Sequence, residues 1–166
     1  MTQTTALSIV PATPADVPLL LQLIRELAGF EKLSHEVVAT EELLQRALFG
    51  PKPTAEAVIA RCGGDDAGFA LFFHNFSTFL AKPGIYLEDL FVRPSFRGQG
   101  IGKALLVHLA QLAHSGDCGR LEWAVLDWNR PARDFYASLG AREVPQWILN
   151  RVTDEALKNL AGSKIA

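Results

Sequence analysis

The sequence predicts an α/β fold in which a mixed sheet carries helices on both faces. Strand-like and helix-like segments alternate along the 166 residues in the order β-α-α-β-β-β-α-β-α-β. The chain has no internal repeat, low-complexity tract or Pro/Ser-rich linker. Its length suits one domain of ordinary size with a sizeable core. We therefore expect a single domain over residues 1–166.

The N-terminal part predicts one strand and two helices. Leu7 to Val10 is a short apolar strand. Thr13 to Asp16 is typical of a helix start, with a hydroxyl cap, a proline in the first position and an acid in the capping-box place. Apolar residues then recur at helical spacing until Gly29, which we expect to end the helix. A second helix is expected after Thr40, and it should stop at Gly50.

The middle of the chain predicts three strands and a long amphipathic helix. Ala55 to Arg61 and Ala67 to Phe76 are strands, and the Gly63-Gly64-Asp65-Asp66 turn between them is typical of a hairpin. Gly84 to Arg93 is a further strand. The helix that follows is expected from about Gly100 to Ala113, with Ile101, Ala104, Leu105, Leu109 and Leu112 on its apolar side.

The C-terminal part predicts two more strands and a capped helix between them. Leu121 to Leu126 is a strand. Asn129 is placed to cap the helix, and Gly140 is placed to end it. Trp147 to Val152 reads as the final strand, with a short helix after it.

Composition excludes several classes of function. The formal net charge of −2 provides no basic field to attract nucleic acid or an anionic membrane. No run approaches the roughly 18 apolar residues of a membrane span, and the first ten residues lack the features of a signal peptide. The two cysteines, Cys62 and Cys118, have no partners at metal-ligand spacing, so we expect reduced thiols and no metal. These observations favour a cytoplasmic protein.

The most informative segment is Arg97-Gly98-Gln99-Gly100-Ile101-Gly102, between a strand and an amphipathic helix. Alternate glycines let the backbone turn tightly and approach a ligand closely. The helix start offers unpaired N–H groups and a positive dipole end, and Arg97 and Lys103 add charge. The segment predicts a site for a phosphate or pyrophosphate, although a plain glycine loop fits the same residues.

Two better-known phosphate loops do not fit this segment. A Walker loop needs Ser or Thr after its Gly-Lys pair, and Ala104 follows Lys103 here. A dinucleotide-binding fingerprint needs its third glycine where Lys103 stands. A nucleotide enzyme of either kind is therefore disfavoured.

Longer stretches of the chain resemble the GNAT superfamily of N-acetyltransferases. Tyr86 to Pro94, followed by Arg97 to Gly102, is similar to the acetyl-CoA motif, whose loop reads (Arg/Gln)-x-x-Gly-x-(Gly/Ala). Trp128-Asn129, Pro131 and Phe135-Tyr136 resemble the part that holds the rest of the co-substrate. Leu23 to Ala28 with Phe30-Glu31 is similar to the diamine branch, the spermidine/spermine and thialysine N-acetyltransferases.

The resemblance implies a GNAT-type sheet, mostly antiparallel and splayed in the middle, and a homodimer. It also implies acetyl-CoA as co-substrate, with no metal. The expected acetyl-CoA-binding residues are Leu90, Phe91, Val92, Arg97, Gly98, Gln99, Gly100, Ile101, Gly102, Lys103, Asn129, Pro131, Ala132 and Tyr136. The expected acceptor-binding residues are Phe30, Glu31, Glu88 and Asp89. The branch usually has tyrosine where Phe30 stands, and its acid near residue 143 is matched at most by Glu143.

Two side chains are expected to be catalytic. Glu88 should attract the ammonium group and accept its proton through water, since only a neutral amine attacks a thioester. Tyr136 should give a hydrogen bond or proton to the departing thiolate. Backbone N–H groups of the Leu90 to Val92 segment should meet the oxyanion, as the family implies. Each residue also has an ordinary structural explanation, Glu88 as a surface acid and Tyr136 as a packed core residue.

The sequence therefore predicts an enzyme that transfers acetyl directly from acetyl-CoA to a small primary amine. The acceptor is expected to be a diamine, a polyamine or a lysine-like amine such as thialysine. A protein or peptide N-terminus or lysine is the alternative acceptor. A non-catalytic acyl-CoA-binding regulatory domain is the alternative class of protein.

Overall fold

The computed structural model describes residues 6–164 and divides them into two compact units. The first unit ends at Ala124 and the second begins at Val125. The single domain expected over residues 1–166 stays a prediction.

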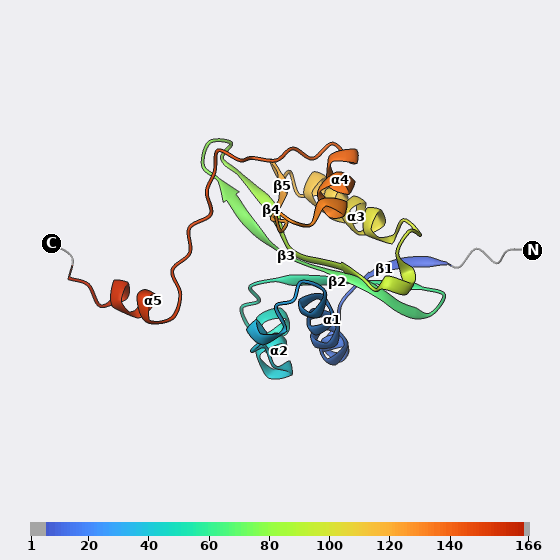
Figure 1. Cartoon of the computed structure of the whole chain (residues 1–166), viewed down its shortest axis with the longest axis horizontal. Helices are drawn as coiled ribbons and strands as arrows, with labels where there is room; N and C mark the ends of the chain where they lie inside the picture. The colour runs from blue at the N-terminus through green and yellow to red at the C-terminus, as the bar shows by residue number, and fades with distance from the viewer. Residues whose placement is uncertain (1–5, 165–166) are drawn as a thin grey trace, which may run out of the picture. The chain divides into compact units, whose positions relative to one another are not determined.

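The first unit is built on a five-stranded sheet in the order β1-β2-β3-β4-β5 (Figure 1). Its strands are β1 (Leu7–Pro11), β2 (Glu56–Cys62), β3 (Asp65–Ser77), β4 (Lys82–Val92) and β5 (Leu121–Trp123). The first four pair antiparallel with their neighbours, and β5 pairs parallel with β4. This confirms the predicted mixed, mostly antiparallel sheet.

The hairpin between β2 and β3 is tighter than expected. Cys62 pairs with Asp65, so only Gly63 and Gly64 form the turn. Both glycines have positive φ, 65° and 94°, which is the combination that a two-residue hairpin requires. Asp65 and Asp66, expected in the turn, therefore belong to β3.

Three helices cover the sheet, with α1 (Val17–Phe30) and α2 (Glu41–Phe49) on one face and α3 (Ile101–Ser115) on the other (Figure 1). Thr13 and Asp16 form the expected reciprocal start, with the Thr13 N–H donating to Asp16 Oδ2 at 2.8 Å. Because residues Pro14–Asp16 form a 3-10 turn, α1 proper begins later than expected. It continues through Gly29 to Phe30, and Lys32, with φ of 62°, follows its end.

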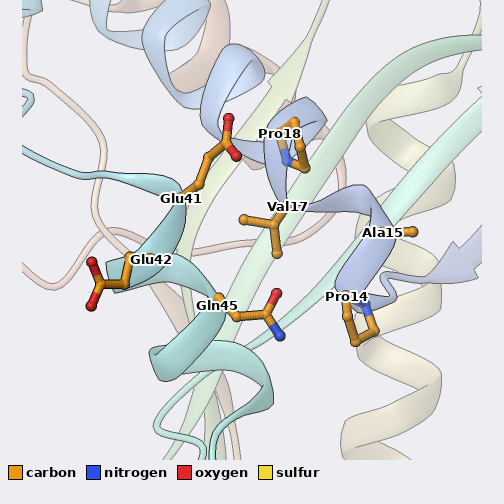
Figure 2. A pocket seen from close by; sticks show the side chains of 7 residues that line it. All are labelled: Pro14, Ala15, Val17, Pro18, Glu41, Glu42 and Gln45. Atoms are coloured by element: carbon orange, nitrogen blue, oxygen red, sulfur yellow. The ribbon is translucent and has the colours of Figure 1, made fainter.

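An open pocket lies between the starts of α1 and α2, and Figure 2 shows the side chains around it. One side comes from the segment that leads into α1, and the other comes from the first turns of α2. The lining residues are Pro14, Ala15, Val17, Pro18, Glu41, Glu42 and Gln45. None of them is among the site residues expected from the sequence.

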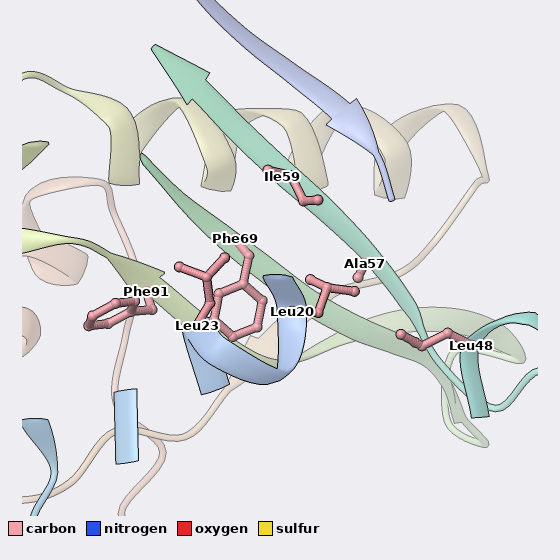
Figure 3. Packing of buried hydrophobic residues seen from close by; sticks show 7 residues of the cluster. All are labelled: Leu20, Leu23, Leu48, Ala57, Ile59, Phe69 and Phe91. Carbon is pink, nitrogen blue, oxygen red and sulfur yellow. The ribbon is translucent and has the colours of Figure 1, made fainter. Parts of the chain in front are cut away.

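The core of the first unit lies between α1, α2 and the sheet. Leu20 and Leu23 of α1 are fully buried and point at the sheet, where they meet Ile59 and Phe69 (Figure 3). Phe91 of β4 belongs to the same cluster, so the core reaches the strand that precedes the glycine loop. Burying side chains of this size stabilises the fold by about 1.5–3 kcal/mol each. The position of α1 over β4 is thus set first by packing.

The second unit contains two helices, α4 (Arg130–Ser138) and α5 (Asp154–Ala161). Asn129 caps α4, and Gly140, with φ of 89°, follows its end, as expected. The strand expected over Trp147 to Val152 is wrong, because this segment pairs with no strand of the described chain. An isolated strand leaves its backbone groups unpaired, so apolar alternation alone does not produce one. Its Trp147, Ile148 and Leu149 side chains are exposed.

Candidate active site

The central feature of the candidate site is a β-bulge in β4 at Glu88. Leu87 pairs with Phe72 and Asp89 pairs with Leu71, so Glu88 is an extra residue with no partner on β3. A bulge of this kind bends its strand and changes which backbone groups face each neighbour. The bulge gives a physical reason why Glu88 is exposed while the residues on either side of it are partly or fully buried.

The pairing of β4 with β5 ends just before the bulge, at the place where the sequence predicts the sheet to splay. Before it, β4 pairs with β5 over Ile85 to Leu87, and the Ile85 N–H donates to the Arg120 carbonyl. After it, the Arg93 N–H donates to the Ala67 carbonyl at the β3 side. Because backbone groups alternate along a strand, the N–H groups of Leu90 and Val92 face the edge that β5 does not cover. Pairing with β4 stops at Trp123, so β5 is shorter than the expected Leu121 to Leu126.

Three carboxylates lie near enough in this region for their charges to interact. Asp89 is half-buried, and burial is the main reason why its pKa rises from 3.8 to about 6. The negative charges of Glu88 and Glu31 contribute to the same rise. Burial also raises the pKa of Glu31, which directly follows α1. The structure therefore brings the expected acceptor-binding acids Glu31, Glu88 and Asp89 into one electrostatic cluster.

The glycine loop has the conformation that close approach of a ligand requires. Gly98 and Gly100 have φ of 77° and 79°, a region that side chains with a Cβ adopt at a cost. A Cβ built on either glycine would have open space within 4 Å. Gly100 is the N-cap of α3 and provides no side-chain cap to the first amides of that helix. These uncapped N–H groups of Ile101, Gly102 and Lys103 fit an anion such as a pyrophosphate.

Arg97 is turned toward the first helix instead of standing free in the loop. Its Nε donates to the Val92 carbonyl at 2.9 Å. Its guanidinium carbon lies 4.7 Å from the centroid of the Phe30 ring and 5.8 Å from that of Phe91. Phe30 itself is exposed at 43%. Contact of the Arg97 side chain with a phosphate therefore stays a prediction, and Gln99 donates to the Ser95 carbonyl within the loop.

The second unit carries the remaining expected residues, with Asn129, Pro131 and Ala132 at the start of α4. Asn129 Oδ1 accepts a hydrogen bond from the Ala132 N–H at 3.3 Å, which confirms its role as a cap. Pro131 lies in the first turn, where its missing N–H costs nothing. The cap employs the oxygen of the Asn129 amide, so the NH₂ group is the part that remains for the expected contact with acetyl-CoA, which stays a prediction.

Tyr136 lies on α4, and its ring contacts that of Phe135 at a centroid distance of 5.4 Å. Its carbonyl also accepts from the Ala141 N–H, which closes the end of the helix. The backbone around Tyr136 is thus well ordered by capping at both ends of α4. Its catalytic role stays a prediction.

Glu143 is held by Arg133 of α4. The guanidinium donates to both carboxylate oxygens, at 2.7 and 3.1 Å, and it also donates to the Asp127 carbonyl at 2.9 Å. Arg133 lowers the pKa of Glu143, so this acid remains charged. Because Arg133 occupies both oxygens, Glu143 is a poor candidate for binding the acceptor.

The sequence interpretation missed one pair of charged residues near the site. Glu26 of α1 and Arg93, which directly follows β4, form a two-point ion pair. Glu26 lies in the Leu23 to Ala28 stretch and Arg93 in the Tyr86 to Pro94 stretch, but the two residues are 67 positions apart and neither stretch indicates the pairing. The sequence places the Glu26 carboxylate beside the apolar face of the predicted helix, but this position does not indicate which residue it pairs with.

No helix within residues 6–164 combines the length and apolar character needed to cross a membrane. Over the same residues, no group of three or more His, Cys, Asp or Glu side chains is arranged to hold a metal ion. The expectation of a metal-free reaction stays a prediction.

Comparisons with known proteins agree with this architecture. The acetyltransferase (GNAT) family model matches residues 21–141. The thialysine N-epsilon-acetyltransferase of Bos taurus is 38% identical over 162 residues, which cover 91% of this chain and 95% of that protein. The L-ornithine N5-acetyltransferase of Arabidopsis thaliana is 34% identical over 192 aligned residues. The alignment covers 89% of this chain and 84% of that protein. The solved structure of a V. cholerae integron cassette protein has a TM-score of 0.80 at 28% identity. The match covers 95% of this chain and 98% of that protein.

The chain therefore belongs to the acetyltransferase (GNAT) family, and the expected similarity to the thialysine branch is confirmed. It is an amine N-acetyltransferase, and acetyl-CoA is the co-substrate that this family uses.

Proposed function

We propose that this enzyme acetylates the primary amine of a small diamine, a polyamine or a lysine-like amino acid. The observation that carries the proposal is the cluster of Glu31, Glu88 and Asp89 beside the uncovered edge of β4. Such a cluster favours a cationic acceptor over a neutral one by simple attraction. A carboxylate on a separate element, as Glu31 is, suits an acceptor with a second positive charge.

The acceptor must lose a proton before it reacts. A primary amine with a pKa of about 10.4 is only about one part in a thousand neutral near pH 7. Glu88 stands at the bulge, exposed to solvent, where a water molecule can relay the proton to its carboxylate. Asp89, with a pKa of about 6, is a second acceptor for that proton.

The loop and the edge of β4 fit acetyl-CoA. The open space at Gly98 and Gly100 and the uncapped start of α3 suit its pyrophosphate. Acetyl-CoA supplies the activated acetyl group as a thioester. The N–H groups of Leu90 and Val92 can then donate to the thioester oxygen as the amine attacks and that oxygen gains negative charge.

The transfer is direct, without a covalent bond to the enzyme. The amine nitrogen forms a bond to the acetyl carbon, the bond from that carbon to sulfur breaks, and coenzyme A leaves as a thiolate. The nitrogen loses two protons in all: one leaves through Glu88 before the attack, and the second leaves after the attack. Tyr136 gives the thiolate a hydrogen bond or a proton, and the second proton from the nitrogen balances it, so that the thiolate ends as the thiol. Asn129, Pro131 and Ala132 are proposed to hold the arm of acetyl-CoA, with Phe91, Arg97, Gln99, Ile101, Gly102 and Lys103 on the loop side.

Two relatives support the class of acceptor. One is named for the Nε nitrogen of thialysine and the other for the N5 nitrogen of ornithine. Both names describe a side-chain amine on a small amino acid. Phe30 next to Glu31 adds an apolar ring that can contact the methylene chain of such an acceptor.

Two alternatives make different predictions. A protein or peptide acetyltransferase would prefer a peptide N-terminus or a lysine within a peptide over any free amine. A non-catalytic acyl-CoA-binding domain would bind acetyl-CoA and acetylate nothing, but the acids at the bulge favour catalysis over it.

An acetylation assay across a panel of acceptors tests the proposal. The panel contains thialysine, ornithine, lysine, spermidine, a simple diamine, a monoamine of the same length and a short peptide. The highest kcat/KM is expected for an acceptor with a second charged group, and the monoamine serves as the matched control. A peptide as the best acceptor, or acetyl-CoA binding without acetylation of any acceptor, would reject the proposal.

We also propose that the enzyme is a cytoplasmic homodimer. Cys62 and Cys118 are free thiols, which suits a reducing compartment. The apolar side chains of Trp147, Ile148 and Leu149 are exposed in a segment that pairs with no strand among residues 6–164. A second copy of the chain can cover these side chains, and twofold dimers are the commonest assembly.

A further inference from the structure

The end of α1 is attached to the segment between β4 and the glycine loop at two points. Arg93 and Arg97 lie four positions apart on either side of a short 3-10 turn, Pro94–Phe96. They contact Glu26 and Phe30, which also lie four positions apart, on consecutive turns of α1. The helix therefore meets the segment with matched spacing, one turn of helix against one turn of 3-10 structure.

The Glu26–Arg93 contact is the more directional of the two. Arg93 Nε and Nη2 donate to the two carboxylate oxygens of Glu26, each at 2.9 Å. Arg93 Nη1 donates to the Asp66 carbonyl at 2.8 Å, and Gln22 Nε2 donates to Glu26 Oε1 at 2.9 Å. The planar Arg93 guanidinium is hydrogen-bonded to Glu26 on one side and to the Asp66 carbonyl on the other, which fixes the orientation of the pair as well as its distance.

The pair adds little that α1 needs for stability. Leu20 and Leu23 already bury this helix against the sheet, and a second ion pair, Asp16–Arg61 at 2.8 Å, holds its start. The Glu26 and Arg93 side chains are 32% and 23% exposed, and pairs with such access to water contribute modestly. What the pair does determine is where the last turn of α1 lies relative to β4.

Glu31 directly follows that last turn. The Phe30–Arg97 contact and the Glu26–Arg93 pair place the end of the helix against the segment that follows β4, and the charge of Glu31 acts on Asp89 of that strand. Glu26 is just over one turn before Glu31, about 7–8 Å along the helix axis. A small rotation of α1 about its packed core would therefore move Glu31 away from β4. The ion pair opposes this rotation because both of its hydrogen bonds must break first.

We propose that Glu26 and Arg93 are positioning residues for the acceptor amine, holding Glu31 beside Asp89 at the bulge of β4. The inference rests on the proposed function, in which these acids receive the cationic acceptor. It adds that the geometry of the acceptor site depends on an ion pair at the root of the loop that binds acetyl-CoA.

A charge-neutral double variant tests the proposal. Glu26→Gln with Arg93→Gln removes one negative and one positive charge, so it leaves the net charge unchanged. Its control is Asp16→Asn with Arg61→Gln, which also removes one charge of each sign. It breaks the Asp16–Arg61 pair at the start of the helix, 15 positions before Glu31, together with the Arg61–Asp66 pair. The kcat/KM for the best amine is expected to fall about tenfold or more in the first variant, since small misplacements of binding groups are costly.

Two further measurements separate positioning from general damage. The Kd for acetyl-CoA should stay within about twofold of wild type by calorimetry. The side-chain carboxyl of Asp89, followed by carbon NMR against pH, should titrate below the wild-type value of about 6, because Glu31 has moved away. The control pair should change neither quantity, and it should keep the wild-type kcat/KM.

The proposal is overturned if the folded double variant keeps the wild-type kcat/KM and the wild-type Asp89 titration. It is also overturned if the control pair loses as much activity as the first. Should the double variant not fold, Glu26→Gln alone is compared with Asp16→Asn alone, with the same order of kcat/KM expected. A wild-type enzyme that acetylates no amine would reject the proposed function, and the Asp89 titration in the two pairs would still decide this inference.

Discussion

Glu31 and Asp89 come from different elements, yet the charge of Glu31 raises the pKa of Asp89. Glu31 follows the last residue of α1, and Asp89 follows the bulge of β4. Burial is the main cause, and with it the charges of Glu88 and Glu31 bring the pKa of Asp89 to about 6, close to the pH at which an enzyme works. The position of the end of α1 therefore affects the protonation of the Asp89 carboxyl group on β4.

The raised pKa of Asp89 predicts a pH-dependent effect on stability. The Asp89 carboxyl group keeps its proton up to a pH near 6 in the folded state, but only up to about 3.8 in the unfolded state. The stability that this group contributes is therefore fully present below about pH 4 and is lost as the pH rises through 6. Asp89→Asn should therefore increase the free energy of unfolding at pH 7, by up to about 3 kcal/mol. Urea unfolding at pH 4 and pH 7 measures this.

Asp65→Asn, at an exposed carboxylate of β3, is the control for that experiment. It should change the free energy of unfolding little at either pH. An equal effect of Asp89→Asn at both values of pH would show that the raised pKa does not act on stability.

Glu88→Gln is expected to reduce activity most at neutral pH and less as the pH rises. The substitution removes the proton acceptor, and more of the amine arrives neutral at high pH. The kcat/KM for the amine is measured against pH for both enzymes, with Glu56→Gln, an exposed glutamate of β2, as the control. Superimposable profiles of wild type and Glu88→Gln would mean that Glu88 is not the base.

Tyr136→Phe is expected to lower kcat about a hundredfold or more, while changing the KM for acetyl-CoA little. The substitution removes one hydroxyl and little volume, so the contact with Phe135 should survive. An interaction made only with the departing thiolate affects the transition state and not the bound substrate. An unchanged kcat at an unchanged melting temperature would assign Tyr136 a packing role only.

Gly100→Glu should weaken acetyl-CoA binding by blocking close approach and by adding a negative charge beside the pyrophosphate. Gly64→Glu is a matched control, since Gly64 also has positive φ and open space around a Cβ, but lies in the β2–β3 turn. Both variants carry the same kind of backbone strain, and only the first should change the Kd measured by calorimetry. Equal affinities in the two folded variants would remove the loop from the acetyl-CoA site.

The wild-type protein should sediment as a dimer at micromolar concentration. Trp147→Ser with Leu149→Ser should shift it toward the monomer, because these exposed side chains are proposed to face a second copy. Phe79→Ser is the control, since Phe79 is 93% exposed in the β3–β4 turn. A monomeric wild type, or a dimer that the double variant leaves intact, would contradict the proposed interface.

Local patterns were enough to predict most of the fold. Three local features were predicted from residues close together in the sequence, and the structure contains all of them: the helix start at Thr13 and Asp16, the helix cap at Thr40 and the Gly63-Gly64 turn. The Trp147 to Val152 segment has an equally clear local pattern, but a strand exists only with a partner. The length of β5 likewise depends on the bulge in β4, which no local pattern of β5 reveals.

The candidate site divides in the same way. The conformations of Gly98 and Gly100 follow from the loop sequence itself. The Glu26–Arg93 pair joins residues that only the packing of α1 on β4 brings together, so neither residue indicates the other. The direction of the Arg97 side chain is also a consequence of packing, because Phe30 and Phe91 provide two aromatic rings within its reach.

The sheet order β1-β2-β3-β4-β5 has a consequence for how the chain is made. Each strand pairs with the one synthesised just before it, so the sheet can grow at one edge while the ribosome is still translating. Only the β1–β2 step, across two helices, and the β4–β5 step, across α3, require long loops to close. The first unit can thus acquire its core, including Phe91, before the residues beyond Ala124 leave the exit tunnel.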